Sequence, residues 1–190
     1  VIRALGQELT VNSAESLFVA IATDTGWFRY SNSGSVAYRI AAQLVELGVD
    51  PEPIFQKIFQ SFSVERTLAL GDLLANIECR SDGKILFSVL SEKMRQRREV
   101  KMEDLDGFVD NLGQVAGTEI VFLVVELGPG RYKVSLRSRG EFSVHAIAAR
   151  FGGGGHVKAA GCRLEGTEEQ VIADLLEVCQ EELMGKSTGS

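Results

Sequence analysis

The sequence predicts an α/β protein in two parts: a mostly helical first part, and a second part of α+β character built on a mixed sheet. Up to about residue 82, apolar residues recur at helical spacing between glycine and proline signals. Beyond it, residues 85–90 and 119–138 carry the patterns of strands. We therefore expect domains at 1–82 and 83–185 and a flexible tail at 186–190, which 190 residues can accommodate.

Helical patterns dominate the first part. Glycines end two of the helical segments, and proline is tolerated in the first turn of a third. The aromatic run Trp27–Tyr30 predicts a short strand. The expected helices run from Asn12 or Ser13 to about Asp24, from Val36 to Leu47, from Pro51 or Pro53 onward, and from Val64 to Asn76.

The second part alternates strands with helices. Gly128-Pro129-Gly130 lies between two strand-like runs and predicts a hairpin. Because side chains alternate along a strand, one face of residues 131–138 is apolar and the other is polar and basic. The expected strands are 85–90, 119–127, 131–138 and 162–164; the expected helices are 91–98, 103–115, one capped by Ser143, a short one of small residues after the glycine run, and 168–184.

Composition narrows the class of protein. Apolar residues make up 45% of the chain, yet no apolar run approaches the roughly 18 residues of a membrane span. The chain begins at Val1 with no leader-like segment. Three widely spaced cysteines fit no metal pattern, and we expect them to be packing residues in a reducing compartment. These features predict a cytoplasmic protein that does not associate with membranes.

Positive charge is concentrated in one segment. The chain carries a net charge of -6, but residues 128–163 contain seven basic residues and one acidic residue, a local balance of +6. Such a segment is either a solvated basic surface or an attractor for a phosphorylated ligand. A second basic run, Lys93 to Lys101, has the same two interpretations.

The segment FGGGGHVKAAG, Phe151–Gly161, lies within the basic region. Its apolar flanks favour a ligand site over a linker, because glycine allows a ligand to approach backbone N–H groups closely. If a helix follows, its N-terminus favours an anion there. His156 and Lys158 are candidate phosphate donors, whereas His145 has no comparable context. The run matches neither a dinucleotide fingerprint nor a P-loop.

Two motifs resemble a known family. FGGGGHVKAAG, preceded by KVSLRSRGEFSVHAIAARF, resembles the GGGHxxAAG signature of the DHH-associated domain. Residues 17–54, which include Asp24-Thr25-Gly26, are similar to the closing segment of the Asp-His-His (DHH) phosphoesterase domain. The chain as a whole resembles bacterial oligoribonuclease/pAp phosphatases, with cyclic and linear dinucleotide phosphodiesterases beside them.

The resemblance implies a manganese-dependent phosphoesterase, a hydrolase whose partner is a short oligonucleotide or phosphorylated nucleotide. It implies that Asp24 is a metal ligand, and carboxylate oxygen suits manganese. It also implies a loose match of Ser31 and Asn32 to a loop near the active site, and it is compatible with a homodimer. The substrate-binding residues that it implies are Arg137, Ser138, Gly153, Gly154, Gly155 and His156.

One departure from the family pattern stands out. The Asp-His-His triplet is absent, and the chain has only two histidines, both in the second part. Since a two-metal site needs several carboxylates and histidines, Asp24 alone cannot form one. We therefore expect a C-terminal portion of a phosphoesterase that binds its ligand and hydrolyses nothing by itself.

Three other functions remain open. The DHH-associated domain also resembles the RNA-binding module of alanyl-tRNA synthetases, although the DTGWFRYSN segment argues against that class. RecJ-type single-strand exonucleases share both motifs. A polyphosphatase would need the same basic, glycine-rich surface.

Overall fold

The computed structural model describes residues 8–29 and 33–187, with side chains described as far as Gly185. The chain divides into two compact units, Val1–Phe62 and Ser63–Ser190. The division lies ahead of the expected boundary at 82/83, because helix α4 (Val64–Ala75) packs Ala69 and Leu73 against the sheet of unit 2.

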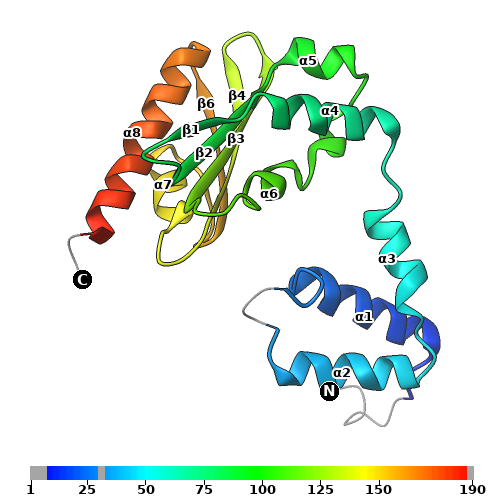
Figure 1. Ribbon diagram of the computed structural model, residues 1–190. Helices are drawn as coiled ribbons and strands as arrows, with labels where there is room; N and C mark the ends of the chain where they lie inside the picture. The colour runs from blue at the N-terminus through cyan, green and yellow to red at the C-terminus, as the bar shows by residue number, and fades with distance from the viewer. Residues whose placement is uncertain (1–7, 30–32, 188–190) are drawn as a thin grey trace. The chain divides into compact units, whose positions relative to one another are not determined.

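Unit 1 contains helices α1 (Val11–Asp24), α2 (Ser35–Glu46) and α3 (Pro51–Phe59) (Figure 1). Its small core centres on Phe18 and Leu44, with Trp27 packed against it. Thr10 caps α1 and Asp50 caps α3, as polar N-cap residues do by accepting a bond from a first-turn N–H. All three helices were expected from the sequence.

The strand expected at Trp27–Tyr30 is wrong for the residues that the structure describes. Trp27 and Phe28 have φ values of 59° and 63°, so the chain turns in the left-handed region instead of extending. The Thr25 hydroxyl accepts a hydrogen bond from the Phe28 N–H at 3.1 Å, and the Trp27 ring packs edge-on against Phe18. Local bonding and aromatic packing thus override the strand propensity. Tyr30, Ser31 and Asn32 lie outside the described residues.

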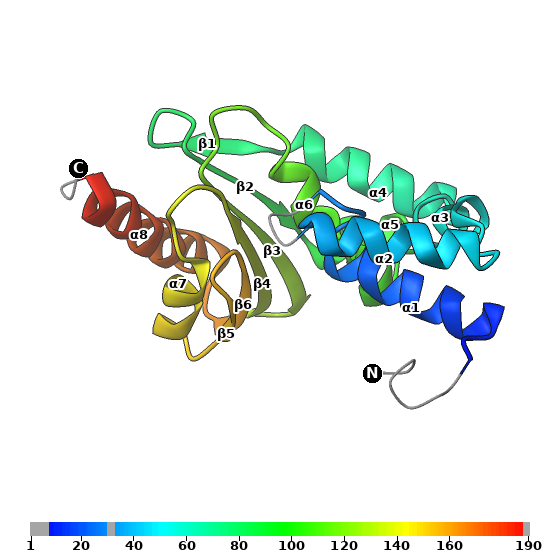
Figure 2. The same cartoon turned by 90° about the horizontal axis from the view of Figure 1, so that it is seen from below.

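Unit 2 is built on a six-stranded sheet in the order β1-β2-β3-β4-β6-β5, which is mixed because β2 and β3 pair in parallel (Figure 2). This sheet confirms the predicted α/β class. The strands are β1 (Glu78–Arg80), β2 (Ile85–Leu90), β3 (Ile120–Gly128), β4 (Arg131–Ser138), β5 (Gly154–His156) and β6 (Ala159–Glu165).

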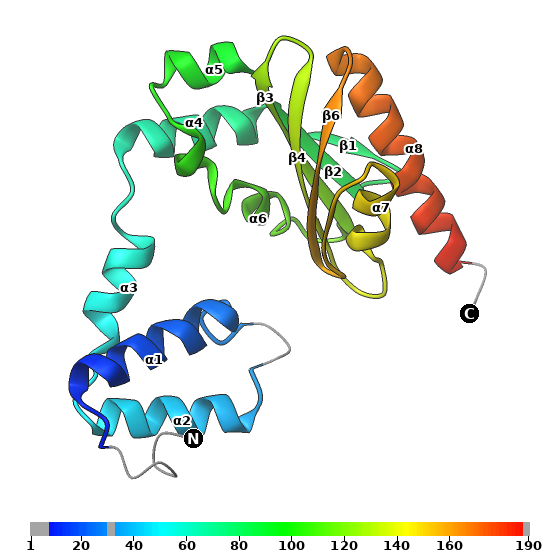
Figure 3. The ribbon, with the colours of Figure 1, turned by 180° about the vertical axis from the view of Figure 1, so that it is seen from behind.

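Two layers of helices flank the sheet (Figure 3). Helices α7 (Val144–Arg150) and α8 (Glu168–Ser187) cover one face, where Phe87, Phe122 and Leu136 are fully buried. The other face is covered over β2 and β3 by α4, α5 (Glu92–Arg97), the 3₁₀ helix η2 (Met102–Leu105) and α6 (Phe108–Leu112). Helix α6 also reaches β4, where Asp110 bonds Arg137. No helix described in unit 2 covers this second face over β6, β5 and the remainder of β4, and we call this part the uncovered face.

Four sequence expectations need correction in unit 2. A single helix over 103–115 is replaced by η2 and α6, because Gly107 between them has a φ of 83°. The small residues 159–161 form part of strand β6, and β1 had no detectable pattern. Helix α8 continues to Ser187, so only residues 188–190 of the expected tail lie outside the description. Cys79 is exposed, whereas Cys162 and Cys179 are buried as expected.

Candidate phosphate-binding surface

Strand register brings Arg137 and His156 to the same face of the sheet. Arg137 of β4 pairs with Ala159 of β6, and Ala159 pairs in turn with His156 of β5. Residues in register on neighbouring strands point to the same side, and two strand spacings amount to roughly 9.6 Å. A small alanine therefore separates an arginine from a histidine on the uncovered face.

The next row of the same face contains almost no side chain. Ser135 pairs with Gly161, and Gly161 pairs with Gly154. Gly154 has nothing within 4 Å of the position that a Cβ would occupy, so its surroundings are open. The two rows form a floor of small residues beside Arg137 and His156, which leaves backbone accessible to a ligand.

The glycine run also serves close packing of the chain. A Cβ on Gly153 would lie 2.3 Å from the Gly161 carbonyl oxygen, and one on Gly155 would lie 2.5 Å from that of Ala159. Gly155 also has a φ of 140°. Thus Gly153 and Gly155 are needed because two backbones approach closely, whereas Gly152 and Gly154 have open space where a Cβ would lie.

The expected helix after the run is absent from the described structure. Residues 154–156 form the edge strand β5, and a turn leads into β6. The small residues extend because Ala159, Ala160 and Gly161 pair with both neighbouring strands. No helix N-terminus therefore follows the glycines, and the proposed contribution of a helix dipole there is wrong.

Arg137 and Ser138 are held in place by neighbours. The Arg137 Nε donates to Asp110 Oδ1 at 2.7 Å and its Nη1 donates to the Leu136 carbonyl oxygen at 3.0 Å, while the side chain is 33% exposed. Ser138 Oγ donates to the Phe142 carbonyl oxygen at 2.8 Å. Nε and Nη1 of Arg137 are thus bonded within the protein, and Nη2 is the nitrogen with no hydrogen bond among the described residues. Ser138 fastens the loop that precedes α7.

Several cations of the basic segment have structural partners. Lys158 Nζ donates to the Gly140 and Phe142 carbonyl oxygens, and Arg139 donates to the Gly113 carbonyl oxygen. Arg150 pairs with Glu181. These three side chains hold loops and helices together, so a part of the +6 segment is explained by the fold.

His145 is a site residue that the sequence reasoning missed. Its Nδ1 lies 2.9 Å from the Gly155 carbonyl oxygen. Because a carbonyl can only accept, this bond requires the proton on Nδ1. His145 is ten residues from Gly155 on a helix, and sequence spacing carries no signal of the contact. The bond ties α7 to the residue directly before His156.

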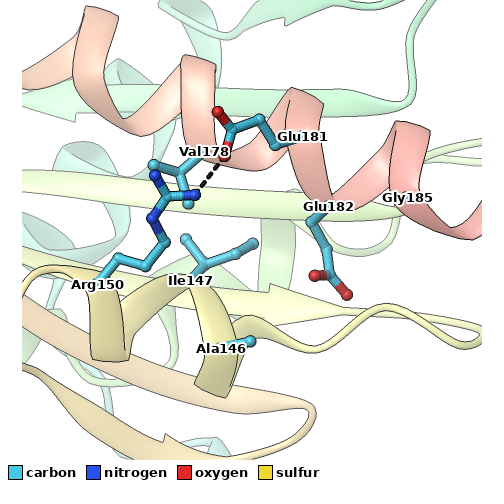
Figure 4. A pocket seen from close by; sticks show the side chains of 7 residues that line it. All are labelled: Ala146, Ile147, Arg150, Val178, Glu181, Glu182 and Gly185. Atoms are coloured by element: carbon cyan, nitrogen blue, oxygen red, sulfur yellow. Dashed lines mark hydrogen bonds and ion pairs between the residues drawn. The ribbon is translucent and has the colours of Figure 1, made fainter.

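A pocket of ≈ 330 Å³ lies between α7 and α8 (Figure 4). Its lining includes Ala146, Ile147 and Val178, and the Arg150–Glu181 ion pair spans it. Both helices cover the apolar face of the sheet, so the pocket is on the opposite side from Arg137 and His156. Arg150, the cation of its described lining, is already paired to Glu181, so the described residues offer no free positive charge to a phosphate there.

Asp24 is in unit 1, at the last position of α1, and its side chain is exposed. Within residues 8–29 and 33–185, no group of three or more His, Cys, Asp or Glu side chains could hold a metal ion. The described residues therefore do not fit a metal centre, and Asp24 is the single implied ligand among them.

No helix in the described part of the chain is long and apolar enough to cross a membrane.

Two curated bacterial proteins are similar to this chain. A bifunctional oligoribonuclease and PAP phosphatase of Thermus thermophilus is 34% identical over 181 residues, covering 94% of this chain and 53% of the relative. A probable protein of the same name from Streptococcus mutans is 26% identical over 154 residues, covering 81% and 49%. The chain thus spans about half the length of the curated relatives it matches.

The fold has a close counterpart among solved structures. An exopolyphosphatase-related protein from Bacteroides fragilis matches with a TM-score of 0.81 and 26% identity, covering 93% of this chain and 51% of that one. The model of the DHHA1 domain matches residues 82–185, which include every strand of the sheet except β1 and carry Arg137, the glycine run and both histidines. The chain belongs to the DHHA1 domain family.

Proposed function

We propose that this chain supplies the nucleotide- and phosphate-binding part of a DHH-family phosphoesterase that acts on short oligonucleotides, pAp or dinucleotides. The observation that carries the proposal is the row Arg137–Ala159–His156 on an uncovered sheet face beside a glycine floor. The names of the two bacterial relatives support the class of substrate.

Each residue of the surface has a chemical role in this proposal. Nη2 of Arg137 grips a phosphate, since Nε is bonded to Asp110 and Nη1 to the Leu136 carbonyl oxygen. His156 donates a hydrogen bond to the same anion from the other side of Ala159. Gly153, Gly154 and Gly155 bring the backbone close to the ligand. Ser138 acts indirectly, by holding the loop between β4 and α7.

We assign the hydrolytic step to a metal site that the described residues do not form by themselves. Because the described residues do not fit a metal centre, we propose that residues 1–82 contribute Asp24 to a divalent-metal site, with manganese as the metal, completed by groups outside these 190 residues. Residues 83–185 then present the substrate. In this division the chain binds and orients a phosphate, and it does not activate water.

The cellular setting is part of the same proposal. All three cysteines are free thiols, and burial raises the pKa of Cys179 to about 12, so this thiol stays neutral and unreactive near neutral pH. Free thiols suit the cytoplasm, where thiols are kept reduced. A homodimer is compatible with this function.

Titration calorimetry with pAp tests the binding role. We expect wild-type chain to bind pAp, and both Arg137→Gln and His156→Ala to weaken binding by about tenfold each, since each removes a charge-assisted or hydrogen-bonded contact worth about 1–3 kcal/mol. Arg80→Gln is the matched control, because Arg80 lies on the opposite edge strand β1. Equal affinity in all variants would remove the surface from consideration.

A turnover assay tests the division of labour. With manganese added, the chain should release no phosphate or mononucleotide from pAp or pApA. Clear turnover that Asp24→Ala abolishes would contradict the proposed inactivity of the chain alone.

A polyphosphatase is the second candidate, because the Bacteroides fragilis counterpart is named exopolyphosphatase-related. Competition between pAp and a short polyphosphate for the same chain separates the two. Displacement of pAp only by a large excess of polyphosphate supports the nucleotide, and the reverse order supports polyphosphate.

A further inference from the structure

The uncovered face carries a second group of basic side chains in addition to Arg137 and His156. Lys133 of β4 pairs directly with Arg163 of β6, so two cations stand side by side on the same face. Like charges directly opposite each other on neighbouring strands are destabilising. Within the described residues, neither side chain has a hydrogen bond or ion pair. The fold thus keeps a like-charge pair that has no bonded carboxylate among the described residues, and Glu165, one row away, lies diagonal to Lys133.

The pair is aligned with the phosphate-binding row. Lys133, Ser135 and Arg137 alternate along β4 and point to one side, as do Arg163, Gly161 and Ala159 along β6. Lys133 is four residues from Arg137, which corresponds to roughly 13 Å along the strand. Between the two positive positions lie Ser135, Gly161 and Gly154, which leave the path free of large side chains.

The positively charged part of this face ends at the row that follows Lys133 and Arg163. In the row after Lys133 and Arg163, Arg131 pairs with Glu165, so a cation faces a carboxylate in the favourable arrangement. At the other end, Asp110 already bonds Arg137. The positive groups without a bonded partner on this face are therefore Lys133, Arg163 and Nη2 of Arg137.

We propose that Lys133 and Arg163 form a second anion subsite, which binds an internal phosphate of a linear oligonucleotide whose terminal phosphate is held by Arg137 and His156. This inference rests on the proposed function and names its substrate class more narrowly. The like-charge pair is retained because a phosphate between the two cations offsets their repulsion. A ligand with its anions confined to one nucleotide does not reach it.

Length decides which ligands use the subsite. At a rise of roughly 3.4 Å per stacked nucleotide, the 13 Å between the two rows corresponds to about four nucleotides, and to fewer when the strand is extended. A pentanucleotide therefore spans both rows, and pAp occupies only the first. Affinity should rise with chain length up to this span and level off beyond it.

The test compares one short and one long ligand on the full 190-residue chain. Lys133→Gln combined with Arg163→Gln should weaken binding of a 5′-phosphorylated adenosine pentanucleotide about tenfold, which equals about 1.4 kcal/mol, and leave pAp affinity unchanged. The slope of log affinity against log salt for the pentanucleotide should fall by about 1.4, since each lost contact to a single strand contributes about 0.7. Lys57→Gln combined with Lys84→Gln removes the same charge from other exposed positions and should change neither.

Stability gives a readout that does not depend on the ligand. Lys133→Glu converts the like-charge pair into an opposite-charge pair, so it should raise the melting temperature slightly while it removes the length-dependent affinity. A variant that binds poorly because it is misfolded would instead melt earlier. This distinction keeps the binding result interpretable.

The outcomes separate the inference from the function on which it rests. If wild-type chain binds neither pAp nor the pentanucleotide, the proposed function fails and the subsite with it. If pAp binds and the double variant retains the full pentanucleotide affinity and salt slope, the subsite is wrong and the function stands. Loss of polyphosphate binding without loss of pentanucleotide binding would assign the pair to an inorganic ligand and overturn the proposal.

Discussion

The two faces of the unit 2 sheet use the same strands for different purposes. Toward α7 and α8, strands β2, β3, β4 and β6 present an unbroken apolar surface, in which Phe87 and Phe122 stack with ring centroids 4.8 Å apart. Toward the other side, β2 and β3 are covered while β4 and β6 present cations, serine and glycine. The difference shows that alternation along β4 fixes both the core and the candidate binding surface.

Core truncation should give the largest effect and the clearest contrast between the faces. Phe122→Ala should lower the free energy of unfolding by about 3–5 kcal/mol, because it deletes a fully buried ring and leaves a cavity. Ser135→Ala on the open face should stay within about 0.5 kcal/mol. Urea denaturation of both variants measures the difference. Similar losses would mean that the second face is packed as well.

The glycine run offers the next largest effect. Gly153→Ala should cost about 1–3 kcal/mol or more, since its Cβ would lie 2.5 Å from the Cβ of Cys162 and must displace the β5–β6 backbone. Gly154→Ala, where the added Cβ meets nothing within 4 Å, is the matched control and should be nearly neutral in stability. Equal destabilisation in urea would show that the run is constrained along its whole length.

A smaller, local effect is expected for His145. His145→Ala should lose about 1 kcal/mol of local stability and speed amide exchange in residues 152–156, because the bond to the Gly155 carbonyl oxygen is lost. His145→Gln, whose amide can donate, should restore part of the protection. The matched control is His156→Ala, which should leave exchange unchanged and weaken pAp binding. Hydrogen exchange followed by mass spectrometry reports on both.

The smallest predicted effect is on the pH dependence of stability. It concerns Asp72 of α4, the helix that packs over β2 and β3. Bonds from Arg98 and Arg97 of the α5 region hold the pKa of Asp72 in α4 well below its usual range. A lowered folded pKa contributes stability above the unfolded value of 3.8, and the contribution is lost as the pH falls through the folded pKa.

Wild type should therefore exceed Asp72→Asn in melting temperature at pH 5–7. The difference should shrink progressively as the pH is lowered below the ordinary carboxyl range. A constant difference down to strongly acid pH would mean that Asp72 acts through packing and not through charge.

Much of the fold could be predicted from local patterns. The strand at 85–90, the hairpin around Gly128–Gly130 and the cap at Ser143 depend on neighbouring residues, and the structure confirms all three. Tertiary pairing decided the segments that were mispredicted. Ala159–Gly161 is extended because strands bind it on both sides, and Trp27–Phe28 turns because its rings pack into the core of unit 1.

The candidate site was predictable in part. Arg137 and His156 were implied by the resemblance, but their common face depends on the register of β4, β6 and β5, which the sequence does not encode locally. The contact of His145 with Gly155 and the pairing of Lys133 with Arg163 also join residues that are far apart in the sequence, ten and thirty positions respectively. Neither could be predicted from neighbouring residues.

The two outermost strands have a consequence for behaviour in solution. β1 and β5 are each three residues long, and an exposed strand edge is the usual template for pairing with another molecule. β1 carries the Glu78–Arg80 ion pair, and the Gly155 carbonyl oxygen of β5 already accepts a hydrogen bond from His145 Nδ1. The sheet therefore offers little free backbone at either edge for pairing with a strand of another molecule. We expect the protein to aggregate less readily than a protein whose edge strands are long and unprotected.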